Sequence, residues 1–217
     1  LITQTLAYQR EGLTIVVVPT VSLAIDQERT AKKIVQSAHV DEEIFCYHSG
    51  VAVASILQAI EKKTAKMLFI SPEALLKNEG FAEAVKKANE ARYLRNLVID
   101  EAHIVVDWGA SFRVDYQCLE SWRRRLLASN PGIRTVLLSA TFDEPCCSVL
   151  KDFFSEDGEK WLEIRCDALR HEPRYMLVKA KSFADKQRKM LELVQKMPHP
   201  MIVYTARPVE AEDVADF

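Results

Sequence analysis

The sequence predicts an α/β protein with a parallel β-sheet that is covered by helices on both faces. Short runs of β-branched and apolar residues alternate with longer segments in which apolar residues recur at helical spacing. The short runs are almost continuously apolar, which is typical of strands that are buried on both faces. Polar residues follow several of these runs directly, and ligands bind such sheets at the carboxyl ends of the strands.

The first part of the chain supplies five of the expected strands and the helices between them. It begins at Leu1, without a methionine, and residues 1–12 resemble the end of a helix, so we expect the parent protein to continue upstream. The expected strands are residues 14–18, 43–47, 66–70, 94–99 and 135–139. The expected helices are residues 21–36, 51–62, 81–93 and 117–129.

The last part of the chain predicts the beginning of a second domain. Expected strands at residues 162–165, 174–178 and 201–204 accompany a helix at 182–196. The buried face of that helix is expected to carry Phe183, Met190, Val194 and Met197. About 45 residues bury too little surface to be stable alone. We therefore expect residues 1–168 to form one domain and residues 169–217 to be the start of another.

Composition places the chain among soluble globular proteins. Apolar residues make up 48% and charged residues 28%, and 29 basic side chains against 31 acidic ones give a net charge of −2. Any contact with phosphates must therefore come from a local patch. The basic run at residues 123–125 is expected to be a solvated helix face, and the alternative is a contact with nucleic acid. No long apolar run or signal peptide is present, so we expect no membrane association.

The five cysteines show no spacing typical of a metal site or of a disulfide framework. This usage favours a reducing compartment. We therefore expect a cytoplasmic location, or a nucleoid or nuclear one if the source is eukaryotic.

Two adjacent carboxylates, Asp100 and Glu101, directly follow the fourth expected strand. A carboxylate at the end of a buried strand can bind Mg²⁺ directly or through water, as in nucleotide hydrolases. The neighbouring glutamate can orient or deprotonate a water molecule. The alternative is that the two acidic residues only cap a helix N-terminus.

The motifs resemble those of superfamily-2 helicases and, more narrowly, of RecQ-like DNA helicases. The resemblance rests on DEAH (100–103), DWGASFRVDY (107–116) and LSAT (138–141). Residues 16–27, 68–76 and 202–215 are similar to motifs Ia, Ib and IV of that family. The resemblance implies RecA-like domains that couple Mg²⁺-dependent ATP hydrolysis to movement on single-stranded DNA and to strand separation at duplex junctions.

The resemblance also implies the roles of five residues. Asp100 would handle Mg²⁺, Glu101 would activate water, and His103 would link the ATP site to LSAT. Ser139 and Thr141 would supply hydroxyl groups that bond to the DEAH segment. The alternative for the LSAT segment is an ordinary turn at the end of a strand.

An aromatic-rich loop that senses single-stranded DNA in RecQ-like helicases matches Trp108, Phe112 and Arg113. An aromatic ring stacks on any base and contributes roughly 1–3 kcal/mol per base. The alternative is that Trp108 and Phe112 only pack in a core. Ala110, Ser111 and Val114 depart from the family's usual residues.

Two further segments are expected to hold a nucleic-acid backbone. Thr20 and Ser22 follow the first expected strand, and Ser71 and Glu73 follow the third. Backbone amides and hydroxyl groups there can bind phosphates. The alternative is helix capping by Ser22, and by Ser71 before Pro72.

The 217 residues contain no G-x-x-x-x-G-K-[ST] phosphate loop, and none of the six glycines precedes a lysine. We expect this loop upstream of Leu1 and the family's arginine finger beyond Phe217, so this chain alone should not hydrolyse ATP. Two other functions stay open. One is a translocase subunit of a DNA defence, restriction or modification assembly, and the other is a non-hydrolysing scaffold that binds protein partners.

Overall fold

The computed structural model describes residues 2–35, 39–106, 114–156, 158, 160–166 and 172–215. The chain divides into two compact units, Leu1–Leu162 and Glu163–Phe217, and each is described by itself. This division lies a few residues before the expected boundary between residues 168 and 169.

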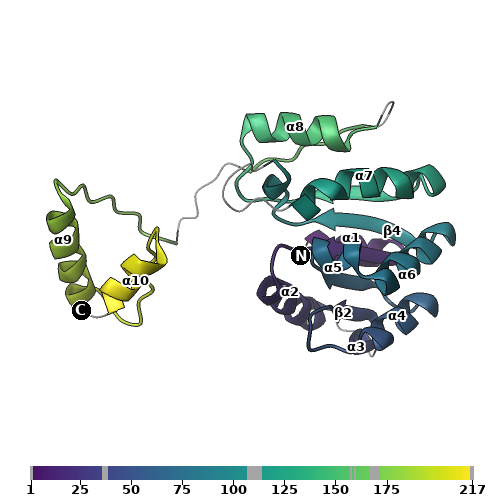
Figure 1. The fold of residues 1–217 in the computed structure, drawn as a ribbon, viewed down its shortest axis with the longest axis horizontal. Coiled ribbons are helices and arrows are strands. Elements are labelled where there is room, and N and C mark those ends of the chain that lie inside the picture. Colours follow the sequence, from purple (N-terminus) through teal and green to yellow (C-terminus); the bar gives the residue numbers. More distant parts are fainter. Residues whose placement is uncertain are drawn as a thin grey trace. The chain divides into compact units, whose positions relative to one another are not determined.

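The first unit is built on a five-stranded parallel sheet (Figure 1). Its strands are β1 (Leu13–Val17), β2 (Ile44–Cys46), β3 (Met67–Ile70), β4 (Leu94–Ile99) and β5 (Arg134–Leu137). They lie in the order β2-β3-β1-β4-β5, and every neighbouring pair is parallel. The predicted α/β fold with a parallel sheet is therefore confirmed, and each strand ends within two residues of its expected bounds.

Helices connect these strands and cover the sheet. They are α1 (Ile2–Gln9), α2 (Val21–Ile34), α3 (Val40–Glu43), α4 (Val53–Glu61), α5 (Pro72–Lys77), α6 (Glu79–Glu90), the 3₁₀ helix η1 (Ala102–Val105), α7 (Val114–Ser129) and α8 (Glu144–Phe154). None of the helices in the described part of the chain is long and apolar enough to cross a membrane.

The core lies in two layers, one on each face of the sheet. Strand side chains alternate between the faces, so Ile15 and Val17 point to one layer and Val16 and Val18 to the other. Residues of α4 to α8 complete the first layer, and residues of α1 and α2 complete the second. The near-continuous apolar strands are explained by this burial on both sides, since every residue of β1 is buried.

The carboxyl ends of the strands lie at one edge of the sheet in matching register. Val17 pairs with both Ile70 and Ile99, and Ile99 pairs with Leu137. The segments that follow β1, β3, β4 and β5 therefore begin at the same edge. These are the segments in which the sequence placed the candidate site residues.

The expectation that residues 123–125 form a solvated face is wrong for Arg123. This side chain is only 3% exposed, and it donates to Thr135 Oγ1 at 2.6 Å and to Glu156 Oε1 at 2.7 Å. Its guanidinium also lies 5.7 Å from the centre of the Phe154 ring. Arg123 thus joins α7 to β5 and to the end of α8.

A buried pair of asparagines joins α6 to α7. Asn89 Nδ2 donates to the Leu126 carbonyl at 3.0 Å and to Ser129 Oγ at 2.8 Å. Asn130 Nδ2 donates to Asn89 Oδ1 at 3.2 Å and to the carbonyl of Leu94 in β4 at 2.9 Å. Both asparagines are 2% exposed, and buried amides are stable only when they are hydrogen-bonded in this way.

Replacing Asn89 with alanine should lower the free energy of unfolding by about 2 kcal/mol, because it removes three of these bonds and leaves buried polar partners behind. Urea unfolding followed by tryptophan fluorescence measures this loss, since Trp122 and Trp161 belong to the first unit. The neighbouring Glu90 is exposed, and Glu90→Ala should change stability by no more than about 0.5 kcal/mol. Equal losses for the two variants would contradict a structural role for the asparagine network.

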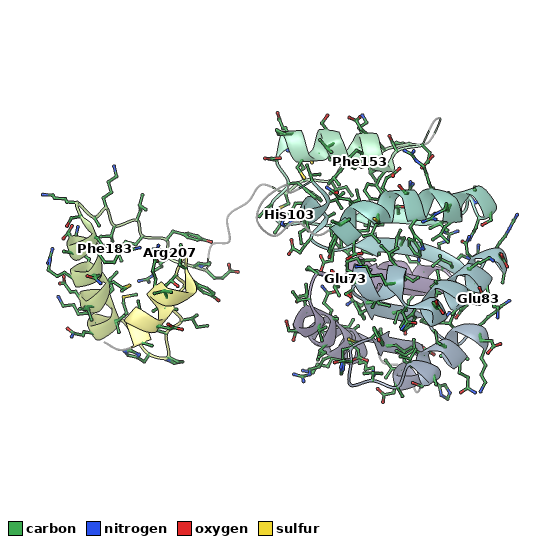
Figure 2. All side chains as sticks on the ribbon, in the orientation of Figure 1. Glu73, Glu83, His103, Phe153, Phe183 and Arg207 are labelled. Carbon is green, nitrogen blue, oxygen red and sulfur yellow. The ribbon has the colours of Figure 1, made fainter. Side chains whose placement is uncertain are left out.

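The second unit contains α9 (Phe183–Lys196) and α10 (Pro208–Ala215). The strands expected at residues 162–165, 174–178 and 201–204 are absent from the described residues, because no neighbouring strand pairs with them. Their side chains stay exposed, and Leu177 and Tyr204 are each 88% exposed. The helix at 182–196 is confirmed, but it has no buried residue, so its expected buried face is wrong, and Phe183 (Figure 2) is 59% exposed.

Candidate functional site

Asp100 stands at the edge of the sheet, directly after β4. Its backbone N–H donates to the carbonyl of Val17 in β1 at 2.9 Å, which fixes the residue between the two central strands. Its half-buried carboxylate accepts one hydrogen bond on each oxygen. Oδ1 accepts from the backbone N–H of Glu101 at 3.1 Å, and Oδ2 accepts from Gln27 Nε2 at 2.5 Å.

The contact with Gln27 was not predicted from the sequence. Gln27 lies on α2, 73 residues away from Asp100 along the chain. It belongs to a helical stripe with the buried Ala24 and Ala31, at spacings of three and four residues. A polar residue on an otherwise apolar helical stripe indicates that its side chain has a polar partner, but the sequence does not reveal which residue that partner is.

Glu101 has a left-handed backbone conformation, with φ 50° and ψ 44°. This region is costly for a residue with a side chain, by about 1–3 kcal/mol, and it persists where surrounding bonds fix it. Here the next amide, of Ala102, donates to the Leu138 carbonyl at 2.9 Å, and the Ile104 amide donates to the Glu101 carbonyl at 3.0 Å. The conformation turns the chain sharply between β4 and η1.

The alternative that the acidic pair only caps a helix is not supported by these contacts. Glu101 occupies the N-cap position of η1, but its side chain makes no capping hydrogen bond. The Asp100 carboxylate bonds to Gln27 and to the next amide instead.

His103 connects the two polar segments at this edge (Figure 2). Its Nδ1 lies 2.9 Å from Ser139 Oγ and 3.2 Å from Glu101 Oε2. With its proton on Nδ1, His103 can donate to Ser139 Oγ or to Glu101 Oε2, and with its proton on Nε2, Nδ1 can accept from the Ser139 hydroxyl. Ser139 Oγ also lies 3.3 Å from Thr141 Oγ1 and accepts from the Thr141 amide at 3.1 Å.

The structure therefore brings together all five residues expected to act on ATP. Asp100 and Glu101 are adjacent, Glu101 Oε2 lies 3.2 Å from His103 Nδ1, and hydrogen bonds run from His103 through Ser139 to Thr141. Ser139 bonds to the DEAH segment through His103, whereas Thr141 contacts Ser139 in an ordinary turn, so the expected role of Thr141 stays a prediction.

The donors around Asp100 fit a hydrated Mg²⁺ ion. Neither donor is a cation, and no described lysine or arginine forms an ion pair with Asp100, so no basic side chain competes with a metal ion for this carboxylate. The described residues contain no group of three His, Cys, Asp or Glu side chains that could hold a metal alone. Mg²⁺ commonly needs only one or two carboxylates, with waters and substrate phosphates as its other ligands.

The residues expected to contact nucleic acid cap two helices at the same edge. Thr20, and not Ser22 as expected, is the N-cap of α2, and its Oγ1 accepts from the Leu23 amide at 3.3 Å. Ser22 Oγ lies 3.3 Å from Thr20 Oγ1. Ser71 caps α5 as expected, with Pro72 in the first turn, and Glu73 follows in that turn. These contacts establish capping, and phosphate binding stays a prediction.

Trp108, Phe112 and Arg113 lie outside the described residues, so the aromatic-loop prediction is untested by the structure.

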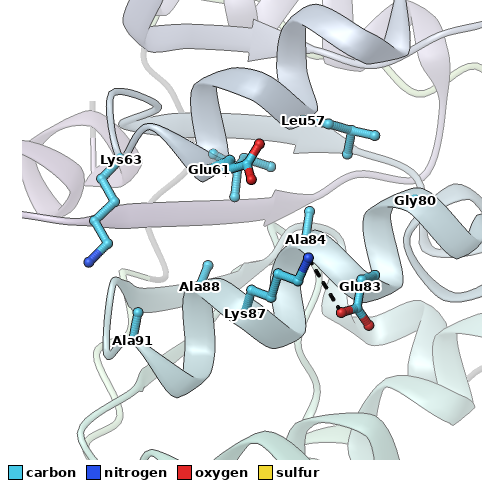
Figure 3. Close-up of a pocket in the computed structure, with 10 residues that line it drawn as sticks. Leu57, Glu61, Lys63, Gly80, Glu83, Ala84, Lys87, Ala88 and Ala91 are labelled. Atoms are coloured by element: carbon cyan, nitrogen blue, oxygen red, sulfur yellow. Dashed lines mark ion pairs between the residues drawn. The ribbon is translucent and has the colours of Figure 1, made fainter.

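Two other features do not extend this site. A groove of about 420 Å³ between α4 and α6 is lined by Leu57, Gly80, Ala84 and Ala88, and none of the expected site residues borders it (Figure 3). Its rim carries an exposed ion pair between Glu83 and Lys87 at 3.7 Å. The five cysteines form no disulfide bond, and burial raises the pKa of the Cys46 thiol to about 11, which keeps it protonated and unreactive at neutral pH.

The geometry agrees with a comparison to protein families. Residues 1–149 match the model of the DEAD/DEAH box helicase family, which is more than half of the chain. The chain belongs to this family. His103 in the DEAH segment of this helicase-family chain lies within hydrogen-bonding distance of Ser139 in LSAT.

Several curated relatives carry the name of an ATP-dependent DNA helicase. The chain is 29% identical to the ATP-dependent DNA helicase Q1 of Rattus norvegicus over 149 residues, which are 65% of this chain and 22% of the relative. It is 32% identical to the ATP-dependent DNA helicase RecQ of Synechocystis, over 61% of this chain and 27% of the relative. It is 34% identical to the ATP-dependent DNA helicase hus2/rqh1 of Schizosaccharomyces pombe, over 61% of this chain and 10% of the relative. The predicted likeness to RecQ-like helicases is confirmed, and the chain spans about a quarter or less of these relatives.

Solved structures of helicases also align with the chain. The DEAD-box helicase Mss116 bound to ssRNA and UDP-BeF matches 70% of this chain and 29% of its own, with a TM-score of 0.46 and 23% identity. The helicase domain of Hef from Pyrococcus furiosus matches 67% of this chain and 27% of its own, with a TM-score of 0.44 and 14% identity.

Proposed function

We propose that the protein is an ATP-dependent DNA helicase of the RecQ-like type, which uses Mg²⁺ and ATP hydrolysis to move on single-stranded DNA and separate strands. One observation carries the proposal: Glu101, next to Asp100, contacts His103 at 3.2 Å, and hydrogen bonds run from His103 to Ser139 and Thr141. These residues lie at the edge of the parallel sheet where ligands commonly bind, which supports roles for Asp100 as a metal ligand and for Glu101 as a base. The names of the curated relatives support DNA as the substrate.

Asp100 would hold Mg²⁺ directly or through water, and the ion would neutralise charge on the ATP phosphates. Glu101 would orient the attacking water and accept its proton. His103 fixes the Glu101 carboxylate from one side, because Nδ1 lies 3.2 Å from Oε2.

Ser139 and Thr141 would transmit the state of the nucleotide. A change in the position of Glu101 alters the bond that Glu101 makes to His103, and His103 shares the same Nδ1 with Ser139. Because Leu138 also bonds to Ala102 and to Ile99, the LSAT segment and the DEAH segment are joined through backbone as well as side chains. Hydrolysis can therefore move the segment after β5.

Thr20, Ser22, Ser71 and Glu73 would form part of the DNA track, with Trp108, Phe112 and Arg113 adding base stacking and charge. Helix N-termini attract phosphates through free amides and the helix dipole. The net charge of −2 makes this local attraction necessary.

ATP hydrolysis by the complete protein should rise most with single-stranded DNA, less with blunt duplex DNA and least with single-stranded RNA. Phosphate release measured side by side with the three nucleic acids, at one salt concentration, tests this order. Strand separation of a fluorescent duplex with a single-stranded tail should require both ATP and Mg²⁺. Hydrolysis that does not respond to DNA, or that responds best to RNA, would overturn the assignment of a DNA helicase.

A further inference from the structure

Gln27 occupies a position where a nonpolar side chain would be expected. α2 packs on the sheet through Ala24 and Ala31, and Gln27 lies between them on the same half-buried stripe. The two small alanines pack against the sheet, and the longer Gln27 side chain extends from the same stripe to Asp100, directly after β4. Its amide then donates to Asp100 Oδ2 at 2.5 Å.

We propose that Gln27 is a positioning residue for Asp100, which holds the carboxylate in the orientation that binds the divalent cation. The inference rests on the proposed function, since it deepens the role of Asp100 in the Mg²⁺ and ATP site. It adds a residue from α2 to a site that otherwise comes from the segments after β4 and β5.

The chemistry of the contact suits this task. An amide N–H is a neutral donor, so it fixes one carboxylate oxygen without cancelling the negative charge that attracts a cation. The Glu101 amide fixes the other oxygen at 3.1 Å. Each ionised carboxylate oxygen can accept about two hydrogen bonds, so lone pairs stay available for a metal ion or its water. A lysine or arginine at residue 27 would orient the carboxylate but would compete with the cation.

Two donors on opposite oxygens also restrict rotation of the Asp100 carboxylate. The Glu101 amide is fixed by the backbone, whereas Gln27 comes from a separate helix 73 residues away in sequence. Without Gln27 the carboxylate would keep one donor and could rotate about its terminal torsion, which is broad for aspartate. A site whose ligand must first be ordered binds its metal more weakly. Removing a group that holds a metal ligand in place commonly lowers metal affinity about 10- to 100-fold.

The alternative is that Gln27 only satisfies a buried polar atom and stabilises the packing of α2. In that case its replacement would lower stability and leave cation binding unchanged. The two roles are separable because methionine matches glutamine in length and helix propensity but has no donor.

The test is cation binding by the complete protein with Gln27→Met, measured with Mn²⁺ as the probe. Mn²⁺ prefers the same oxygen ligands as Mg²⁺, and its free concentration is followed by electron paramagnetic resonance. In the presence of a non-hydrolysable ATP analogue, Gln27→Met should bind Mn²⁺ about 10-fold more weakly than the natural protein. Binding of the analogue in excess chelator should be the same for both proteins.

Gln58→Met is the matched control, because Gln58 is an exposed glutamine on the covering helix α4. It should bind Mn²⁺ like the natural protein. If Gln27→Met does not fold, Gln27→Ala provides the same measurement, and loss of folding in both variants would overturn the proposal in favour of a packing role.

The proposal would be overturned if a folded Gln27 variant bound Mn²⁺ as tightly as the natural protein. It would also be overturned if the variant lost affinity for the analogue without metal by the same factor as it lost affinity for Mn²⁺. Failure of the proposed function gives a different result. The natural protein would then bind no Mn²⁺ with the ATP analogue and would not hydrolyse ATP, whatever residue stands at position 27.

Discussion

Replacing Glu101 with glutamine should lower DNA-stimulated ATP hydrolysis by about 10²- to 10⁴-fold, the usual contribution of a general base. Glutamine has the same shape and can still bond to His103, but it cannot accept a proton from water. Glutamine and glutamate have similar backbone preferences, so the left-handed conformation at this position should persist. ATP should bind with unchanged affinity, since Asp100 and its two donors stay in place.

Phosphate release and equilibrium binding of a fluorescent ATP analogue, both in the complete protein, measure the two effects separately. Glu83→Gln is a matched control, because Glu83 forms only an exposed pair with Lys87 in the groove between α4 and α6. This control should hydrolyse ATP at the natural rate. A Glu101→Gln protein with normal turnover would show that another residue activates the water.

The sheet and its polar edge follow from the sequence because a single physical rule connects them. Apolar runs such as residues 94–99 are strands, alternation with helices makes them parallel, and parallel strands end at one edge. The juxtaposition of Asp100 with Ser139 follows from that rule and from no detail of side-chain packing. The link between the DEAH segment and Ser139 through His103 was implied by family resemblance, and His103 Nδ1 lies 2.9 Å from Ser139 Oγ.

Contacts that depend on the exact approach of one element to another were not predictable. Gln27 extends to Asp100 from α2, which packs against the sheet through two small alanines. Spacing could have indicated Arg123, since it follows Leu119 by four residues and precedes Leu126 by three on the buried face of α7. Composition alone suggested a solvated run, because arginine is rarely buried without a partner.

The second unit shows the limit of local patterns. Residues 174–178 and 201–204 have the composition of strands, but a strand is defined by its hydrogen-bonded neighbours. No such neighbour is present in the described part of residues 163–217, and Leu177 and Tyr204 stay exposed. The amphipathic pattern of α9 predicted the helix correctly, because helical hydrogen bonds lie within the segment.

Arg123→Ala should lower the free energy of unfolding by about 3 kcal/mol, at the lower end of the cost of breaking a buried ion pair. The substitution removes the hydrogen bonds to Thr135 and Glu156 and the contact with the Phe154 ring. It also truncates a side chain that is buried, with only 3% of its surface exposed. Urea unfolding followed by tryptophan fluorescence measures the loss. Arg124→Ala is the control, because the neighbouring side chain is 58% exposed and pairs with Glu120 in the same helix, which is worth about 0.5 kcal/mol.

Variants of Glu156, the ion-pair partner of Arg123, separate the contribution of charge to stability from that of packing. Glu156 is 33% exposed, so it can be hydrated when Arg123 is lost, whereas Arg123 cannot be hydrated when Glu156 is lost. Glu156→Gln should therefore cost about 1–2 kcal/mol, more than an ordinary surface substitution. Combining Arg123→Met with Glu156→Gln should recover much of the stability, because an apolar side chain of similar length fills the site without a charge to desolvate. If the double variant is as unstable as Arg123→Ala, the guanidinium contacts with Thr135 and the Phe154 ring account for the stabilisation, and the ion pair contributes little.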